Sequence, residues 1–170
     1  YVFGWLPTRV GEKDDGGWQW GGNLVVHEVI QQADGTLKVR PPDSVTEAFN
    51  ETNRFEPKLV LGKWSAGRDY VTALSVSRYS AMTLGLLPDE CMVEATITYG
   101  TGTANCGLLL RTDASLEHLY QVRIEPSNQR IVLDRWPRPG DQAFMLERPL
   151  PTTPDMAVTL RLFLDSTCLV

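Results

Sequence analysis

Tryptophans near the start of the chain have the type and spacing of a ligand-stacking surface. Trp18 and Trp20 are separated by one residue, so both indoles project from the same face of a strand, and Trp5 precedes them. An indole face stacks on the C–H face of a sugar ring while its N–H reaches a hydroxyl. The plainer interpretation is that these large aromatic side chains pack against a neighbouring protein layer. Trp18 and Trp20 are therefore candidate carbohydrate-binding residues, with packing as the alternative.

Acidic and nucleophilic residues form no recognisable catalytic set. Glycosidases use two carboxyl groups that flank the bond to be cleaved. Asp14 and Asp15 lie in a glycine-rich loop, and Asp89 and Glu90 come just before an expected strand. Adjacent acids in such places are usually solvated. With two histidines and no Gly-x-Ser-x-Gly elbow, covalent catalysis has no identifiable nucleophile and base. By itself, the sequence predicts no catalytic residue.

Metal and phosphate sites are not expected either. The run His27–Gln31 begins like the zinc motif His-Glu-x-x-His, but its fifth residue is Gln31 and its pattern is that of a strand. His118 has no cysteine or histidine at ligand spacing. The run Gly100–Gly102 lies between two expected strands with no helix after it, so we expect a glycine-rich hairpin and not a phosphate loop. We predict no metal and no cofactor.

Composition excludes further classes of protein. The 170 residues include 16 Lys+Arg and 21 Asp+Glu, and the net charge of −5 argues against nucleic-acid partners and polybasic membrane docking. The longest apolar runs are about four residues, against the roughly 20 that a membrane helix needs. Cys91, Cys106 and Cys168 are an odd number, which favours free thiols over a disulfide framework and slightly favours a cytoplasmic location. Because the chain starts without Met and ends inside an apolar run, we expect a piece of a longer protein.

The dominant periodicity of the chain is two residues, which is typical of strands. Apolar and polar residues alternate over 93–99, 120–125 and 158–165. Turn signals separate such runs, among them Asp34-Gly35 and the stretch 126–129. Short strands at this spacing predict an all-β fold, either a β-sandwich or a jelly roll.

The chain divides into three parts on this reading. Residues 1–42 form a strand-rich segment, 43–58 a linker with a short helix, and 59–170 a sandwich. A short helix is expected because Ser44-Val45-Thr46-Glu47 is a capping-box arrangement, in which the Ser hydroxyl accepts an early backbone N–H and the Glu side chain reaches back.

Motifs of the first part resemble the end of the catalytic propeller in glycoside hydrolase family 32, the β-fructosidases (invertases, levanases, inulinases and relatives). The motifs are Phe3-Gly4-Trp5-Leu6, Trp18-Gln19-Trp20-Gly21-Gly22-Asn23-Leu24-Val25-Val26-His27-Glu28, Asp34-Gly35-Thr36-Leu37 and Pro41-Pro42. Where family members usually have Pro-Arg-Glu-Leu, this chain has Val26-His27-Glu28-Val29, as expected of a divergent branch. In the second part, Gly107–Arg111, Ile131–Arg135 and Leu160–Asp165 are similar to the family's C-terminal, lectin-like sandwich.

The resemblance implies a retaining hydrolase that cleaves fructosyl bonds of sucrose, levan or inulin type. The family's catalytic residues lie in Asn-Asp-Pro, Arg-Asp-Pro and Glu-Cys motifs of earlier blades, and the first two are not found here. Glu90-Cys91 matches the third only by letters, inside the sandwich, so Glu90 receives no catalytic role.

The chain is then expected to be a C-terminal accessory fragment without catalytic residues, made of closing propeller strands (1–42) and a sandwich that lacks its last strands. Its expected partners are its own catalytic propeller and fructose-containing carbohydrate. A second copy could also cover the strand edges of 1–42 as a homodimer. Two alternatives stay open: a free-standing carbohydrate-binding β-sandwich, and a complete small hydrolase with an unrecognised carboxylate pair.

Overall fold

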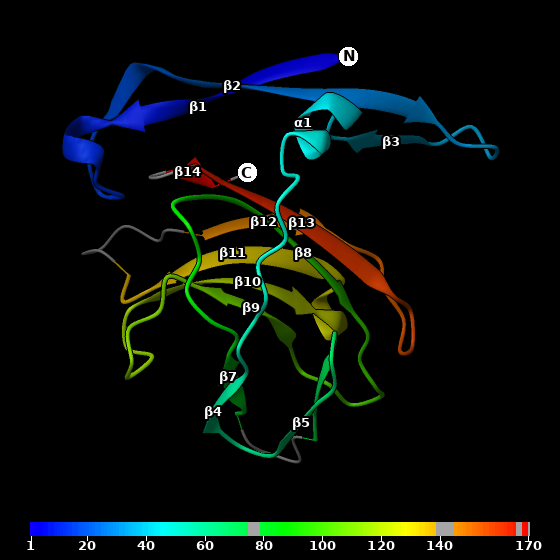
Figure 1. Cartoon of the computed structure of the whole chain (residues 1–170). Helices are drawn as coiled ribbons and strands as arrows, with labels where there is room; N and C mark the ends of the chain where they lie inside the picture. The colour runs from blue at the N-terminus through cyan, green and yellow to red at the C-terminus, as the bar shows by residue number, and fades with distance from the viewer. Residues whose placement is uncertain (75–78, 139–144, 166–167, 170) are drawn as a thin grey trace.

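The computed structural model describes residues 1–74, 79–138, 145–165 and 168–169. The chain is almost entirely β, and every strand pair in these ranges is antiparallel (Figure 1). The strands are β1 (Val2–Arg9), β2 (Trp18–Gln31), β3 (Leu37–Arg40), β4 (Lys58–Leu61), β5 (Trp64–Ala66), β6 (Val71–Ala73), β7 (Ala81–Thr83), β8 (Glu90–Ile97), β9 (Cys106–Leu110), β10 (Leu119–Glu125), β11 (Arg130–Trp136), β12 (Met145–Pro149), β13 (Val158–Asp165) and β14 (Cys168–Leu169). The helical elements are α1 (Asp43–Glu47) and the 3-10 turns η1 (Val10–Glu12) and η2 (Pro126–Asn128). The predicted all-β, sandwich-like fold is confirmed.

The N-terminal sheet has the strand order β1-β2-β3. Val2 lies opposite His27 and Pro7 opposite Gly22, with a register shift before Arg9. The predicted hairpin at Asp34-Gly35 joins β2 to β3. Gly35 has φ of 85°, and the backbone N–H of Thr36 donates to Asp34 Oδ1 at 3.0 Å.

A short helix and an irregular stretch lead from this sheet to the rest of the chain. Helix α1 is preceded by Pro42 as its N-cap and has no side-chain cap. The capping box at Ser44 is therefore wrong: the N-cap is Pro42, two residues earlier than expected, because the fixed φ of proline places it directly before a helix that starts at Asp43. In the described part of the chain, no helix is long and apolar enough to cross a membrane.

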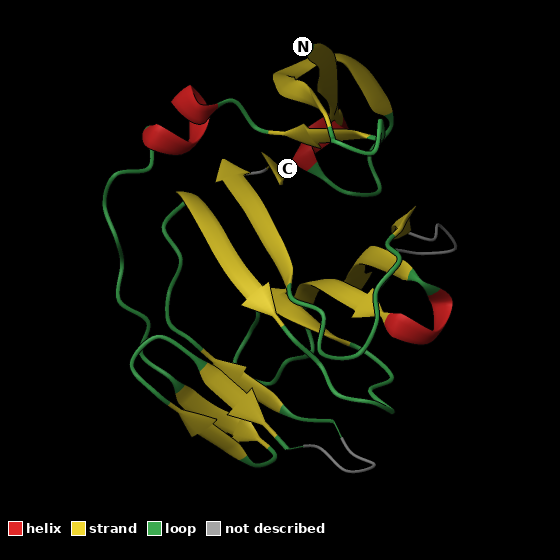
Figure 2. Ribbon diagram, turned by 90° about the vertical axis from the view of Figure 1, so that its right-hand side faces the viewer, coloured by secondary structure: helices red, strands yellow, loops and turns green. Residues whose placement is uncertain are grey.

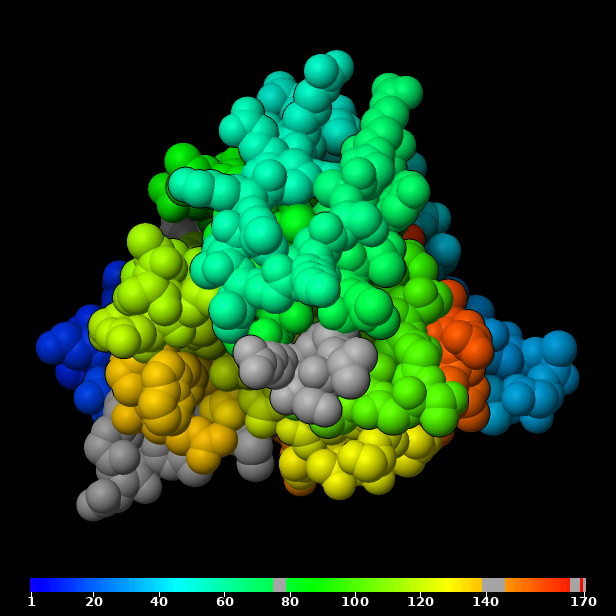
Figure 3. Space-filling model, turned by 90° about the horizontal axis from the view of Figure 1, so that it is seen from below, coloured from blue at the N-terminus to red at the C-terminus, as the bar shows by residue number. Residues whose placement is uncertain are grey.

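Two sheets that face each other form the sandwich (Figure 2). One has the order β12-β11-β10-β9 and the other β14-β13-β8. Their facing sides bury the main core: Cys91, Tyr99, Leu110, Val122, Ile124, Val158, Leu160, Leu162 and Leu164. Alternate residues of β13 point into this core, as the period of two predicts. The small pairs β4–β7 and β5–β6 lie at one end, seen from below in Figure 3 (cyan to green).

The glycine-rich run Gly100–Gly102 does not form the expected hairpin. It connects β8, which pairs with β13, to β9, which pairs with β10. The loop therefore crosses from one sheet of the sandwich to the other. Its glycines are compatible with a hairpin and with a crossing between sheets. The crossing results because β8 pairs with β13 and β9 pairs with β10.

Burial is distributed unequally along the chain. Among the described residues, all the buried ones lie from Ala81 onward, so β1 to β6 have none. The exposed large apolar side chains of the N-terminal sheet and its loop are Tyr1, Val2, Phe3, Trp5, Val10, Trp18, Trp20, Leu24, Val29, Leu37 and Val39. This sheet consequently has no core of its own within the chain.

Candidate functional site

The two candidate sugar-binding tryptophans lie at the start of β2 and each contacts a residue of β1. Trp20 stacks on Trp5, with ring centroids 5.9 Å apart and planes inclined by 29°. The Arg9 guanidinium lies 3.6 Å from the ring centroid of Trp18, a cation–π geometry. The Arg9 contact had no signal in the sequence, because β1 and β2 are brought together only by their antiparallel pairing.

These contacts leave much of both indoles free. Trp18 is 66% exposed and Trp20 is 91% exposed. Each retains a face that could stack on a sugar ring or on an apolar protein layer. Leu24 lies directly opposite Trp5 in the ladder and is also exposed, so the apolar surface extends beyond the aromatic rings. Such a surface is larger than a single stacking site requires.

A second feature joins the N-terminal segment to the sandwich. Asp14, in the loop between β1 and β2, accepts hydrogen bonds on Oδ2 from the Tyr120 hydroxyl at 2.6 Å and from Arg135 Nη1 at 2.5 Å. Burial, together with the bond to Asp14, raises the pKa of Tyr120 to about 12. The expectation that both loop acids are solvated is thus wrong for Asp14, whereas Asp15 is exposed.

Further contacts act at the same boundary. Asn23 Nδ2 donates to Asp165 Oδ2 at 3.2 Å. The ring centroids of Phe49 and Phe163 are 5.6 Å apart, so the segment after α1 also touches β13. Asp165 and Phe163 alternate with the inward-pointing leucines of β13, so they lie on its outer face. This outer face is the docking surface for the N-terminal half.

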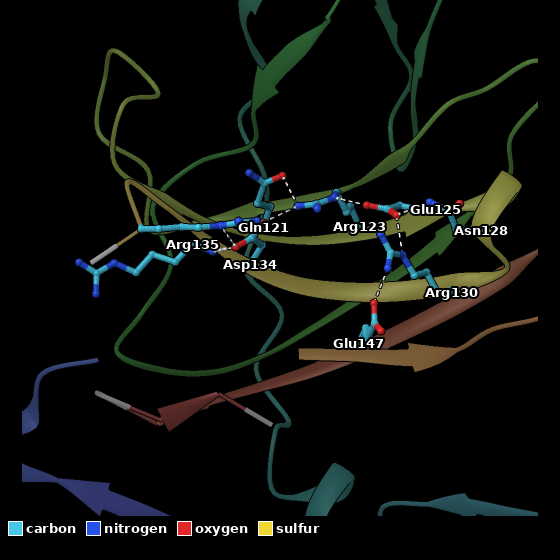
Figure 4. A network of polar contacts seen from close by, with 9 residues as sticks. Gln121, Arg123, Glu125, Asn128, Arg130, Asp134, Arg135 and Glu147 are labelled. Carbon is cyan, nitrogen blue, oxygen red and sulfur yellow. Dashed lines mark hydrogen bonds and ion pairs between the residues drawn. The ribbon is translucent and has the colours of Figure 1, made fainter. Parts of the chain in front are cut away.

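The least exposed carboxylates among the described residues form a polar network on the face of β10 and β11 that points away from the core (Figure 4). Arg123 lies between them: its Nε donates to Glu125 at 2.8 Å and its Nη1 to Asp134 at 3.2 Å. Arg130 binds the other oxygen of Glu125 at 2.7 Å, and Arg138 Nη2 binds Asp134 at 2.7 Å. All these carboxylate oxygens face guanidinium donors.

The electrostatics of this network do not suit general acid catalysis. Hydrogen bonds from Asn128 and Arg123 lower the pKa of Glu125 to about 2. Burial alone would raise the pKa of Asp134, but the Arg138 side chain and the Arg135 backbone N–H more than offset it, and the pKa is lowered. A glycosidase acid needs a raised pKa so that it holds a proton near neutral pH. The network therefore acts as a structural ion-pair cluster.

The remaining candidate residues, Glu90 and the cysteines, do not come together in one site. Glu90 lies within β8 opposite Asp165, on an exposed ladder position. Cys91 and Cys106 are free thiols whose pKa values burial raises, so they are protonated and unreactive; the side chain of Cys168 lies outside the described part. No group of three or more potential metal ligands occurs within the described ranges.

Comparison with known proteins adds no relative to this description. No protein-family model matches the chain, and no curated protein matches it. The features that bear on function are the exposed N-terminal sheet and its contacts with the sandwich.

Proposed function

We propose that this chain is the C-terminal accessory part of a glycoside hydrolase similar to family 32, whose parent acts on fructosyl-containing sugars of sucrose, levan or inulin type. In this proposal β1–β3 are the closing strands of the last propeller blade, and the sandwich stabilises the propeller. The catalytic carboxylates belong to other blades of the parent, so the chain alone is inactive.

Exposed apolar side chains on both faces of the N-terminal sheet carry the proposal. Val2 and Phe3 are neighbours in β1 and point to opposite faces, yet they are 45% and 69% exposed. Apolar residues on both faces are typical of a sheet covered by protein on both sides. Blades of a propeller are arranged in this way around their axis.

The contacts of Asp14, Asn23 and Phe49 support the accessory role of the sandwich. They tie the loop, the middle strand and the linker of the N-terminal half to β10, β11 and β13. A sandwich attached at several points to one blade would hold that blade, and through it the propeller, in a fixed position.

A free-standing carbohydrate-binding sandwich is the alternative, and the exposure of Trp18 and Trp20 favours it. Its prediction differs: the isolated chain would bind glycans through these indoles, and no propeller would be needed to cover β1–β3. The exposed apolar residues of β3, Leu37 and Val39, have no role in this alternative.

The sequence of the coding DNA upstream of Tyr1 tests the proposal directly. We expect an open reading frame that encodes Asn-Asp-Pro, Arg-Asp-Pro and Glu-Cys motifs in turn. A start codon close to Tyr1 would overturn the proposal, and the carbohydrate-binding alternative would take its place.

The role of the indoles is tested in the full-length parent. If Trp20 contacts substrate, Trp20→Ala weakens the affinity for fructose oligomers, measured by calorimetry. Trp136→Ala is the matched control, because Trp136 is also exposed and belongs to the sandwich, at the end of β11. Unchanged affinity in Trp20→Ala would leave these indoles a packing role only.

A further inference from the structure

A cavity of about 390 Å³ lies at one end of the sandwich, distant in sequence from the tryptophans. Three connections line it: the loop from β8 to β9, the turn η2 between β10 and β11, and the loop from β12 to β13. In the view of Figure 3, the η2 turn (yellow) lies at the lower edge of the molecule. The volume lies within the roughly 300–1,000 Å³ of small-molecule sites.

Hydrogen bonds between the three connections hold the cavity in shape. The Tyr99 hydroxyl donates to Thr152 Oγ1 at 2.6 Å, and this contact is buried. The Asp155 backbone N–H donates to the Tyr99 carbonyl at 2.9 Å. Both bonds tie the β12–β13 loop to the β8–β9 loop, so the wall that they share is formed before any ligand arrives.

Gln129 attaches the η2 turn to the β12–β13 loop. Its Nε2 donates to the Thr152 carbonyl at 3.0 Å, and its Oε1 accepts the Thr152 backbone N–H at 3.0 Å. The side-chain amide of Gln129 thus forms two hydrogen bonds with the backbone of Thr152, one as donor and one as acceptor, as two residues in neighbouring strands do. Gln129 has φ of 50°, the left-handed conformation that ends η2. A site of this rigidity loses little entropy on binding.

The lining of the cavity is uncharged and combines hydroxyl groups with apolar groups. None of its residues is charged, in a chain with a net charge of −5. Thr103 and Ser127 contribute hydroxyls that make no hydrogen bond with another side chain or backbone group of the described residues. Pro126, Pro154 and Ala104 contribute C–H surface between them. An anion or cation would lose its hydration here without a counter-charge.

We propose that this cavity binds a neutral polyhydroxyl ligand, one ring of a saccharide. A sugar ring presents hydroxyls around its edge and C–H groups on its faces. Thr103 and Ser127 bind the hydroxyls of the ring, and the prolines contact its C–H face. This site is separate from the tryptophan surface, and it does not depend on the presence of a propeller.

Nuclear magnetic resonance titration of the 170-residue chain with D-fructose, D-glucose and sucrose tests the proposal. We expect at least one sugar to shift the backbone amide signals of residues 99–104, 126–129 and 152–154. The indole N–H signals of Trp18 and Trp20 report on the other candidate surface in the same spectra. D-Glucuronate, which differs from D-glucose by a carboxylate, is expected to bind more weakly than D-glucose.

Two variants locate the site. Gly100→Leu should abolish the shifts, because Gly100 lines the cavity and a Cβ there would meet no heavy atom within 4 Å, so the backbone can accept a bulky side chain at its rim. Thr103→Val removes one hydroxyl at nearly constant shape and should weaken binding about tenfold. Thr101→Val is the matched control, since Thr101 is on the same loop but does not line the cavity.

The outcomes separate this site from the proposed function. Cavity shifts that vanish in Gly100→Leu and persist in Thr101→Val support the site. Shifts confined to the indole signals, shifts unchanged in Gly100→Leu, or no shifts with any sugar would each overturn it. None of these results bears on whether a propeller precedes β1, which the coding sequence decides separately.

Discussion

The hydroxyl of Tyr120 donates a 2.6 Å hydrogen bond to the carboxylate of Asp14, which precedes it by 106 residues. Tyr120 lies directly opposite Arg135 in the β10–β11 ladder, and Arg135 binds the same oxygen of Asp14. A neighbouring pair on the sandwich thus holds one carboxylate of the β1–β2 loop. This contact fixes the N-terminal sheet relative to the sandwich more specifically than apolar packing would.

Asp14→Asn should loosen the N-terminal sheet without unfolding the sandwich. The amide side chain cannot pair with the Arg135 charge, and the loss should cost the docked state about 1–2 kcal/mol. Hydrogen exchange is expected to speed up about tenfold in β1 and β2 and to stay unchanged in β10 and β11. Asp15→Asn is the control on the exposed neighbour, and equal effects of the two variants would contradict the role of Asp14.

Tyr120 should make stability fall at high pH. Its pKa is raised from 10.0 to about 12, so between these values the folded state keeps a proton that the unfolded state has lost. Stability is then fully present below pH 10 and decreases as the pH rises toward 12. Denaturant unfolding should show a smaller decrease over this range in Tyr120→Phe. Tyr70→Phe, at an exposed position, should behave as the wild type does.

Glu125 should make stability fall at low pH. Hydrogen bonds from Asn128, Arg123 and Arg130 lower its pKa from 4.5 to about 2, so the unfolded chain takes up this proton first. The stabilisation is present above pH 4.5 and is lost as the pH falls toward 2. In Glu125→Gln, urea unfolding midpoints should change less with pH than in the wild type. A Glu56→Gln control with the same flattened profile would exclude this explanation.

The alternation of β13 shows how well local pattern predicts this fold. Val158, Leu160, Leu162 and Leu164 are buried because the pleat of one strand places them on one face, and this depends only on neighbours in sequence. The path of the Gly100–Gly102 loop was not predictable in the same way. Turn residues permit a reversal, but the strand that pairs with β8 lies far along the chain.

The same distinction between local pattern and distant contacts applies to the candidate site residues. Trp18 and Trp20 could be singled out because aromatic side chains at alternate positions are a local signal. Asp14 gave none, since its partners follow it by 106 and 121 residues. The cavity is built from three connections whose hydroxyls and prolines are ordinary loop residues, so only their meeting in space distinguishes them.

Gly107→Ala should destabilise the sandwich. A Cβ at this position would lie 2.1 Å from the Val122 carbonyl oxygen and 2.7 Å from the Arg123 Cα, both backbone atoms of β10. Moving the strands apart should cost about 1–3 kcal/mol. Gly100→Ala provides the comparison, because its Cβ would meet nothing within 4 Å. Thermal unfolding with an equal melting temperature for both variants would contradict the close approach of β9 and β10.

The separation of the docking partners along the chain has a consequence during synthesis on the ribosome. The segment with Asp14 and Asn23 emerges first, but its partners Tyr120, Arg135 and Asp165 follow by 106, 121 and 142 residues. At typical translation rates the wait is about 5–30 s. For that interval the N-terminal sheet lacks its docking partners, so the contacts that fix it on the sandwich form only after most of the chain has been made.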